Sequence, residues 1–390
     1  MHELLNGIRV LDFGRYVAGP YCATLLGYLG AEVIRVERAR GGEDRYIAPF
    51  EGTETGGLFM QTGCNKRSLA LNFRNPDTRE VVERLIKTAD VIVVNLPPRA
   101  LQRMGLDWET VQSLNPRAIL ATQTAFGSEG PLADRGGFDG VAQAMSGALY
   151  MTGTPGEPVK AAAPYVDFST AVMSALGVMA ALLARRDTGV GQHVEANLLH
   201  TALAVFGSHL AEQGALGLNR TPSGNRVQTS GPSDVFATRD GHILTHVVGN
   251  GLFRRCAELL GREAWLDDEQ LLSDQGRGDA RNLLCPAMGE WCAQRSTEEA
   301  LEALEAAGIP SGPVLNLQEA LDLPQAGALE MFRSMGFPGW SGTAPVVDLP
   351  LRFSEGAAGI EAPPPALGAD NKDLLAELGF DEKAIRALLD

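Results

Sequence analysis

A single carboxylate, Asp167, precedes a long apolar run in the stretch PYVDFSTAVMSALGVMAALLARR at residues 164–186. Asp is a favoured cap at the start of a helix, because its side chain accepts a hydrogen bond from a backbone N–H. The same place suits a nucleophile. A helix N-terminus favours a negative charge, and a partly dehydrated carboxylate can attack an activated acyl group. Taken alone, the residue types favour the cap, leave the nucleophile open, and predict that Asp167 is ionised.

Strand and helix patterns alternate through the first 200 residues or so. Apolar runs predict strands at 8–13, 31–37, 68–73, 90–96, 118–124 and 191–198. Helical patterns lie between them at 21–29 and 77–89, and the run after Asp167 predicts a further helix. This alternation is typical of a doubly wound α/β domain with a parallel sheet.

The pattern changes near residue 215. A polar, Gly-, Pro- and Ser-rich stretch follows, and then a hairpin that turns at 239–241. Helical patterns come next at 250–260 and 280–294, and Ser296 with Glu299 matches a capping box. We therefore predict a large domain at 1–214, a linker at 215–231, a small α+β domain at 232–315, and a return segment at 316–390.

Composition limits the class of protein. The net charge of −15 argues against a nucleic-acid partner, which needs a basic face, but a few local arginines can still hold an anionic small molecule. The five Cys are scattered without a CxxC, so we expect neither disulfides nor a zinc site, and a reducing cytoplasm. The His residues form no helical i, i+4 pair, and we predict no metal.

Targeting and nucleotide-binding motifs are missing as well. The N-terminus lacks the pattern of a signal peptide. The apolar run at 168–184 is about one turn too short to span a membrane, so we expect a buried helix and no membrane partner. The first strand–helix–strand unit ends in Glu37, where a dinucleotide fold places its ribose-binding acid. Its loop lacks GxGxxG, however, which argues against NAD.

Several longer stretches together resemble the family III CoA-transferases. They are GIRVLDFGRYVAGPYCATLLGYLGAEVIRVER, NKRSLALNFRNP, ADVIVVNLPPRALQRMGLDWETVQSLNPRAIL, GFDGVAQAMSG and DFSTAVMSALGVMAALLARRDTGVGQHVE. The family includes formyl-CoA:oxalate and carnitine CoA-transferases, and α-methylacyl-CoA racemases share its fold. The likeness covers most of the chain and is strongest in the first 200 residues.

The resemblance implies a Rossmann-like CoA-binding large domain, a small α+β domain and an interlocked-ring homodimer. The family's catalytic Asp falls on Asp167. Coenzyme A or acyl-CoA would be a substrate, and no metal is implied. The positions that match the family's CoA contacts are Val17, Ala18, Arg38, Leu71, Asn72, Phe73, Arg74, Asn95, Leu96 and Arg103. Arginine suits the CoA phosphates, although Arg38 and Arg103 would otherwise be read as solvated surface charges.

The motif GGFDGVAQ separates two activities within this fold. Family racemases place a His just before the Asp, and a two-base racemisation needs such a partner. This chain has Phe138 there, followed by Asp139, which favours a transferase. Asp139 is expected either to support catalysis or to cap the helix that follows it.

Further positions are candidates for oxyanion and acid binding. Ser230 and Gly231 could supply backbone donors for an oxyanion or form a plain turn. Val17 stands where formyl-CoA transferases carry Gln, so exchange between formate and oxalate is not expected. Another small carboxylic or dicarboxylic acid would then be the acceptor, and Arg15, Tyr16 and Arg226 are its candidate contacts.

The sequence therefore predicts an enzyme that moves CoA from an acyl-CoA to a small carboxylic acid through an aspartyl anhydride and an aspartyl-CoA thioester on Asp167. An acyl-CoA isomerase or racemase of the same fold is the first alternative. A non-catalytic CoA-binding protein is the second.

Overall fold

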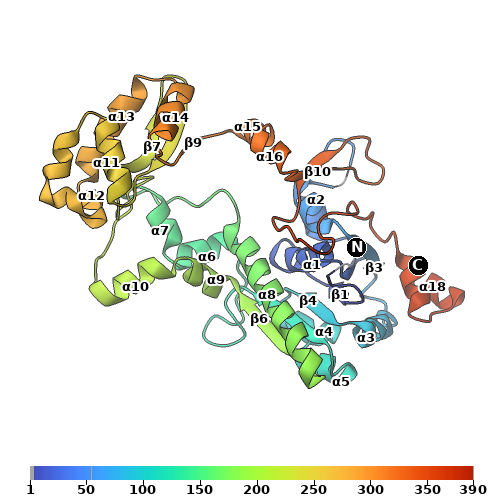
Figure 1. Cartoon of the computed structure of the whole chain (residues 1–390). Helices are drawn as coiled ribbons and strands as arrows, with labels where there is room; N and C mark the ends of the chain where they lie inside the picture. The colour runs from blue at the N-terminus through green and yellow to red at the C-terminus, as the bar shows by residue number, and fades with distance from the viewer. Residues whose placement is uncertain (1–3, 54, 390) are drawn as a thin grey trace. The chain divides into compact units, whose positions relative to one another are not determined.

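The computed structural model describes residues 4–53 and 55–389 (Figure 1). Its backbone contacts divide the chain into two compact units. The first comprises the chain up to Ser146, Ala161–Glu212 and the chain from Gln325 onward, and the second comprises Gly147–Lys160 and Gln213–Pro324. The first unit is thus assembled from three stretches of chain.

Six parallel strands form the sheet of the first unit, in the order β3-β2-β1-β4-β5-β6. They are β1 (Arg9–Asp12), β2 (Glu32–Arg38), β3 (Lys66–Leu71), β4 (Val91–Val94), β5 (Ile119–Thr124) and β6 (His193–Asn197). The predicted parallel sheet and its strands are confirmed. The order reverses between β1 and β4, and in open α/β sheets ligands bind outside the carboxyl ends of the strands at such a point.

Helices cover both faces of this sheet. One face packs under α3 (Thr78–Thr88), α5 (Trp108–Leu114), α17 (Asn371–Glu377) and α18 (Glu382–Leu389), and the other under α1 (Ala18–Tyr28) and α8 (Tyr165–Thr188). Because successive side chains of a strand point to opposite faces, Ile92 and Val94 enter the first layer and Val91 and Val93 the second. A strand buried on both faces must be apolar throughout, as β4 is.

Shorter helices complete the first unit. They are η1 (Glu43–Tyr46), α2 (Gly57–Gly63), α4 (Pro98–Met104), α6 (Asp139–Met145), α9 (Leu198–Val205) and α16 (Pro324–Ala328). A two-stranded sheet pairs β10 (Phe332–Met335) with β11 (Ala344–Val347). The edge strand β3 is closed by the return segment, because the backbone N–H groups of Ser68 and Ala70 donate to the side chains of Asp370 and Asn371, both at 2.8 Å.

The second unit contains a three-stranded antiparallel sheet, β7 (Ser233–Ala237), β8 (His242–His246) and β9 (Ser311–Pro313). Its helices include α7 (Ala148–Thr152), α11 (Asn250–Leu259), α12 (Asp274–Asp279), α13 (Arg281–Ala293), α14 (Thr297–Ala306) and α15 (Leu317–Leu321), with the 3-10 turns η2 (Glu263–Asp267) and η3 (Glu269–Leu272). Helix α10 (Gly207–Leu216) runs across the boundary between the units. The predicted hairpin is confirmed, and so is the capping box of Ser296 and Glu299.

Helix α8 is longer than its apolar run suggested. Among the described residues it is the one helix long and apolar enough to cross a membrane by length and composition, and 44% of its most apolar window is buried. Ala171, Val178 and Ala181 pack into the core. Val172, Met173, Leu176 and Leu183 are exposed, so the expectation of a buried helix holds for one face only. All five cysteines are free, as expected.

Candidate functional site

Two loops meet at the point where the strand order reverses. The backbone N–H of Arg15, after β1, donates to Asn95 Oδ1, and Asn95 Nδ2, after β4, donates back to the Arg15 carbonyl, both at 2.7 Å. Gly14 donates to Asp12 Oδ1 at 2.8 Å. A Cβ on Gly14 would lie 2.6 Å from Pro20 Cδ, so only glycine fits there. Tyr16 has a φ of 60°, which is strained for a bulky residue. The loop after β1 is thus held in one conformation.

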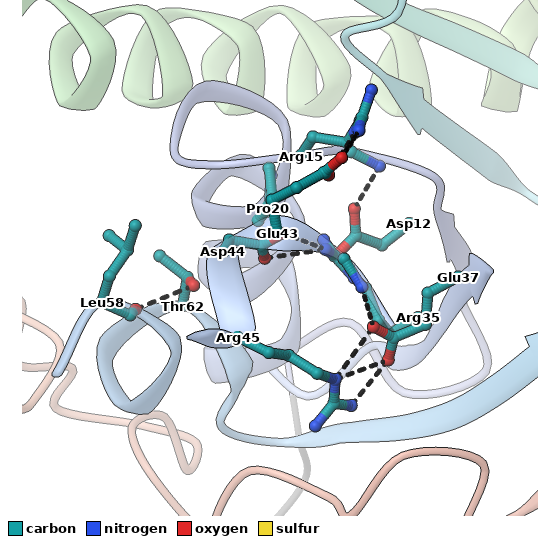
Figure 2. Close-up of polar contacts among 12 residues, drawn as sticks. Asp12, Arg15, Pro20, Arg35, Glu37, Glu43, Asp44, Arg45, Leu58 and Thr62 are labelled. Atoms are coloured by element: carbon teal, nitrogen blue, oxygen red, sulfur yellow. Dashed lines mark hydrogen bonds and ion pairs between the residues drawn. The ribbon is translucent and has the colours of Figure 1, made fainter. Parts of the chain in front are cut away.

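A buried charge network lies beneath this loop. Asp12 Oδ2 accepts from Lys66 Nζ at 2.8 Å and from Arg35 at 3.2 Å. Arg35 also donates to the carboxylate of Asp44 (Figure 2). Lys66 in turn donates to the Pro20 carbonyl at 2.8 Å. Although burial opposes ionisation, Lys66 and Arg35 hold the pKa of Asp12 below its usual range. The network ties β1, β2, β3, α1 and η1 together under the site.

Glu37 serves the same scaffold. Its carboxylate accepts from Arg45 Nε at 2.9 Å and from the Gly42 N–H at 3.0 Å (Figure 2). The acid that a dinucleotide fold would turn toward a ribose is therefore occupied by a buried ion pair.

Three cavities of the first unit collect the positions expected to bind CoA. The largest, about 760 Å³, is lined by Arg38, Phe73, Leu96 and Arg103 together with Arg15. A second, about 350 Å³, is lined by Val17, Ala18, Asn95 and Leu96 together with Tyr16 and Asp167. A third, about 650 Å³, is lined by Arg38, Leu71, Asn72, Phe73 and Arg74. Adjacent cavities share residues, since Arg15 and Leu96 line the first two and Arg38 and Phe73 the first and third.

The largest cavity, which we call the arginine cavity, carries positive charge despite the acidic chain. Arg15, Arg35, Arg38, Arg79 and Arg103 line it, together with one carboxylate, Glu37. Glu43 binds two of them, accepting from Arg15 Nε at 3.0 Å and contacting Arg38 NH2. Burial works against this acid, yet its bonds to Arg15 and Arg38 lower the pKa of Glu43 to about 2. Glu43 itself lines the neighbouring 650 Å³ cavity, so a carboxylate of the protein occupies two arginines that a ligand anion could bind.

Asp167 lies in the first turn of α8 and not at its cap. The N-cap residue of α8 is Pro164, whose side chain makes no capping hydrogen bond. No described residue donates a hydrogen bond to the Asp167 carboxylate, which lines the 350 Å³ cavity. The capping prediction for Asp167 is therefore wrong, because the helix begins at Tyr165, three residues earlier than a cap at 167 requires.

Asp139 caps this helix from another element. Its Oδ2 accepts the backbone N–H groups of Val166 at 2.7 Å and Asp167 at 3.1 Å, and its Oδ1 accepts from Gln143. The alternative that Asp139 caps its own helix, α6, is also wrong, since Phe138 is the cap residue there and makes no capping bond. The ring of Phe138 packs edge-on against Tyr16, with centroids 5.6 Å apart.

The proton affinity of Asp167 follows from this setting. Burial and the nearby Asp139 carboxylate raise the pKa of Asp167 to about 7. The helix N-terminus alone predicted an ionised group, but desolvation and the second acid outweigh it. At neutral pH the carboxylate is about half ionised, and it is more basic than an ordinary aspartate.

Three candidates fall in the second unit. Ser230 is buried, and its hydroxyl has no partner among the described residues. A Cβ on Gly231 would lie 3.0 Å from the Arg277 carbonyl, so Gly231 allows a close backbone approach. Arg226 donates to Asp234 at 2.9 Å and to Asn282 at 3.2 Å.

The sequence analysis missed several residues that line the Asp167 cavity, which we call the aspartate cavity. Gln123, Asp134, Arg135 and Leu198 all line it. Gln123 is buried at the end of β5 and donates to Ser174 Oγ at 2.6 Å. A polar residue at the carboxyl end of an apolar strand was the available signal. Within residues 4–53 and 55–389, no three His, Cys, Asp or Glu side chains are grouped as a metal site would require.

Known proteins resemble this chain over nearly its whole length. CoA-transferase family III matches residues 5–371. A succinate–glutarate CoA-transferase of Agrobacterium fabrum is 32% identical and covers 97% of this chain and 96% of its own. The human succinyl-CoA:glutarate CoA-transferase is 31% identical over 99% of this chain and 88% of its own. A crystal structure of a CAIB/BAIF family protein from Brucella suis superposes with a TM-score of 0.85 at 30% identity, covering 97% and 100% of the two chains.

Proposed function

This chain belongs to the family III CoA-transferases and acts as a CoA-transferase, and we propose that Asp167 carries the acyl group and then CoA between an acyl-CoA and a small carboxylic acid. The observation that carries this proposal is the unbonded Asp167 carboxylate in a cavity that adjoins the arginine cavity. Since Asp139 binds the helix N–H groups, the Asp167 carboxylate is left for chemistry.

The exchange runs in four balanced steps. Asp167 attacks the donor thioester carbonyl and expels CoA thiolate, giving a mixed anhydride. The thiolate attacks the aspartyl carbonyl, releases the donor acid and leaves an aspartyl-CoA thioester. The acceptor carboxylate attacks that thioester and expels the thiolate again, and the thiolate then attacks the acceptor's carbonyl, so that the new acyl-CoA leaves and Asp167 is restored. Covalent catalysis divides one difficult exchange into these easier steps.

The raised pKa of Asp167 supports the first step in two ways. A more basic carboxylate is a stronger nucleophile, and a pKa of about 7 still leaves about half of it ionised at neutral pH. The arginine cavity supplies cations for the CoA phosphates. The positions predicted to contact CoA remain part of this proposal.

Isomerisation at the α-carbon is less well supported. That reaction needs an acid and a base on either side of the carbon. The described residues that line the aspartate cavity include no histidine, and Phe138 stands where family racemases carry one.

We infer the class of the acceptor acid from the names of the similar proteins. Their names specify glutarate, D-citramalate and mesaconate as acceptors of CoA from succinyl-CoA, and a formyl-CoA:oxalate CoA-transferase is also similar, at 31% identity. We take a small dicarboxylic acid as the acceptor.

We also propose the interlocked homodimer that the resemblance implies, in the cytoplasm. The exposed apolar residues Val172, Met173, Leu176 and Leu183 of α8 support an interface, since such a patch favours burial against protein. Sedimentation velocity of wild type and of Leu176→Lys tests this proposal. If both proteins sediment as dimers, α8 is not part of the dimer interface.

The chemistry is tested by mixing the enzyme with an acyl-CoA and no acceptor. Intact-protein mass spectrometry should detect an added CoA or acyl group, localised to Asp167 by peptide mapping. Asp167→Asn should lose both the adduct and the exchange. Asp134→Asn, which changes the other carboxylate of the cavity, should keep both. An adduct that persists in Asp167→Asn, or solvent deuterium at the α-carbon without exchange, would refute the proposal.

A further inference from the structure

The aspartate cavity contains one cation without a partner. Its charged lining residues are Arg15, Asp134, Arg135 and Asp167. Glu43 binds the guanidinium of Arg15. The guanidinium of Arg135 has no hydrogen bond or ion pair with any residue of the described chain. An acid that enters beside Asp167 therefore meets a single uncommitted arginine.

The backbone around Arg135 is held in place. Its N–H donates to the Leu132 carbonyl at 2.9 Å, and the Ala133 N–H donates to Gly130 at 3.3 Å. Two residues on, a Cβ on Gly137 would come within 2.9 Å of Ala125 Cβ, so this glycine lets the loop pack closely on the chain after β5. The loop backbone is thus held at Arg135, whose side chain is exposed and lines the cavity.

The rest of the lining suits a short hydrocarbon chain. Val17, Val141 and Leu198 contribute apolar side chains to the same cavity. Its volume of about 350 Å³ is near the lower end of small-molecule sites. An apolar wall combined with a free guanidinium fits a molecule with methylenes and a terminal anion.

We propose that Arg135 binds the distal carboxylate of a dicarboxylic acid whose other carboxylate reacts at Asp167. This inference rests on the proposed function, because it assigns a residue of that same site to the substrate. The planar guanidinium matches a carboxylate with two parallel hydrogen bonds. A monocarboxylic acid of equal length has no second carboxylate for Arg135. The guanidinium then stays solvated and adds no binding energy.

The chemistry favours the distal carboxylate over the reacting one. The reacting carboxylate loses its charge whenever it becomes an anhydride or a thioester, whereas the distal carboxylate keeps its charge through every step. A cation paired with the distal group binds substrate, intermediates and product alike. Such uniform binding lowers KM with little effect on kcat. Arg135 is therefore a specificity-determining residue.

A competition experiment tests this pairing. One acyl-CoA donor is mixed with equal concentrations of glutarate and pentanoate, which have the same chain length and differ in the distal carboxylate. The ratio of the two CoA products, measured by mass spectrometry, equals the ratio of the two kcat/KM values and does not depend on how much enzyme is active. Wild type is compared with Arg135→Gln, Arg135→Lys and Arg254→Gln, whose arginine is exposed on α11.

We expect Arg135→Gln to lower the glutarate-to-pentanoate ratio about 10- to 100-fold, as loss of a charged hydrogen-bonded pair does. Its KM for glutarate should rise while kcat changes little. Arg135→Lys should keep part of the preference, and Arg254→Gln all of it. An unchanged ratio in Arg135→Gln overturns the inference and leaves the transferase proposal intact. Equal loss of both products in folded Arg135→Gln also overturns it, because the arginine would then serve the reacting carboxylate. A wild type that forms no covalent adduct on Asp167 with the acyl-CoA donor refutes the proposed function itself.

Discussion

Asp139 Oδ2 accepts the backbone N–H of Asp167 at 3.1 Å, so one acid stabilises the helix end on which the other is exposed to the cavity. The two carboxylates lie 28 positions apart in the sequence. Asp139 caps the helix, and the carboxylate of Asp167 stays free of that task. The same proximity raises the pKa of Asp167.

Asp139→Asn should shift the pH dependence of the reaction. Removing the negative charge of Asp139 lowers the pKa of Asp167, so the rise of kcat/KM with pH, expected near pH 7 in wild type, should move to lower pH. The amide also loses acceptor capacity toward Val166, Asp167 and Gln143, which should cost about 1–2 kcal/mol of folding stability. Asp134→Asn is the matched control. A pH profile that does not move would contradict the electrostatic link between the two acids.

Asp167→Asn should stabilise the protein at alkaline pH. The pKa of Asp167 is about 7 in the folded chain against an ordinary value of 3.8. The folded state therefore binds the proton more tightly, and its stability falls as pH rises from about 4 to about 7. The side chain of Asp167→Asn is a neutral amide that does not titrate, so the variant does not lose this stability as the pH rises. After allowance for partial solvent exposure, we expect a gain of roughly 1–2 kcal/mol at pH 8 and none at pH 4, measured by urea unfolding. Equal differences at both pH values would rule out titration as the cause.

Glu43→Gln should tighten CoA binding. Glu43 occupies Arg15 and Arg38 at the arginine cavity, and a phosphate group must compete with it. With the charge removed, calorimetry should give a dissociation constant about 2- to 5-fold lower, the size expected for a partly exposed ion pair. Glu80→Gln on α3, where Glu80 pairs with Arg84 instead, should leave the constant unchanged. Weaker binding in Glu43→Gln would mean that this acid positions the arginines and does not compete with the ligand.

Two neighbouring glycines provide a matched test of the loop at 133–137. A Cβ on Gly137 would meet Ala125 at 2.9 Å, whereas a Cβ on Gly136 would meet nothing within 4 Å. Gly137→Ala should displace the loop and raise KM for the acid several-fold, with folding stability lowered by about 1 kcal/mol or more. Gly136→Ala should behave as wild type in steady-state kinetics. Similar KM values in both variants would show that the loop tolerates the displacement.

Much of the first unit could be predicted from local pattern. Continuous apolar runs such as Val91–Val94 signal strands buried on both faces, and the parallel sheet follows from their alternation with helices. The capping box at Ser296 is equally local. Sequence reasoning also placed Asp167 near the start of a helix, although the helix begins at Tyr165 and the cap belongs to Asp139.

What escaped prediction depends on contacts between distant residues. Nothing near Lys66 indicates that this charged residue is buried, because its partner Asp12 lies 54 residues away. The pairing of Arg15 with Glu43 is of the same kind. Arg135 had no signal of its own, since a cation in a polar, glycine-rich loop is typical of solvent-exposed turns. Its relation to Asp167 emerges only when the loop packs against the end of β5.

The closure of the edge strand β3 by Asp370 and Asn371 has a consequence for biosynthesis. During translation, the free edge of the sheet stays open to pairing with other chains until the segment around Asp370 has left the ribosome, and exposed edges of this kind promote aggregation. The last strand of the sheet ends at Asn197, so covering of the β3 edge comes well after the strands themselves have been synthesised.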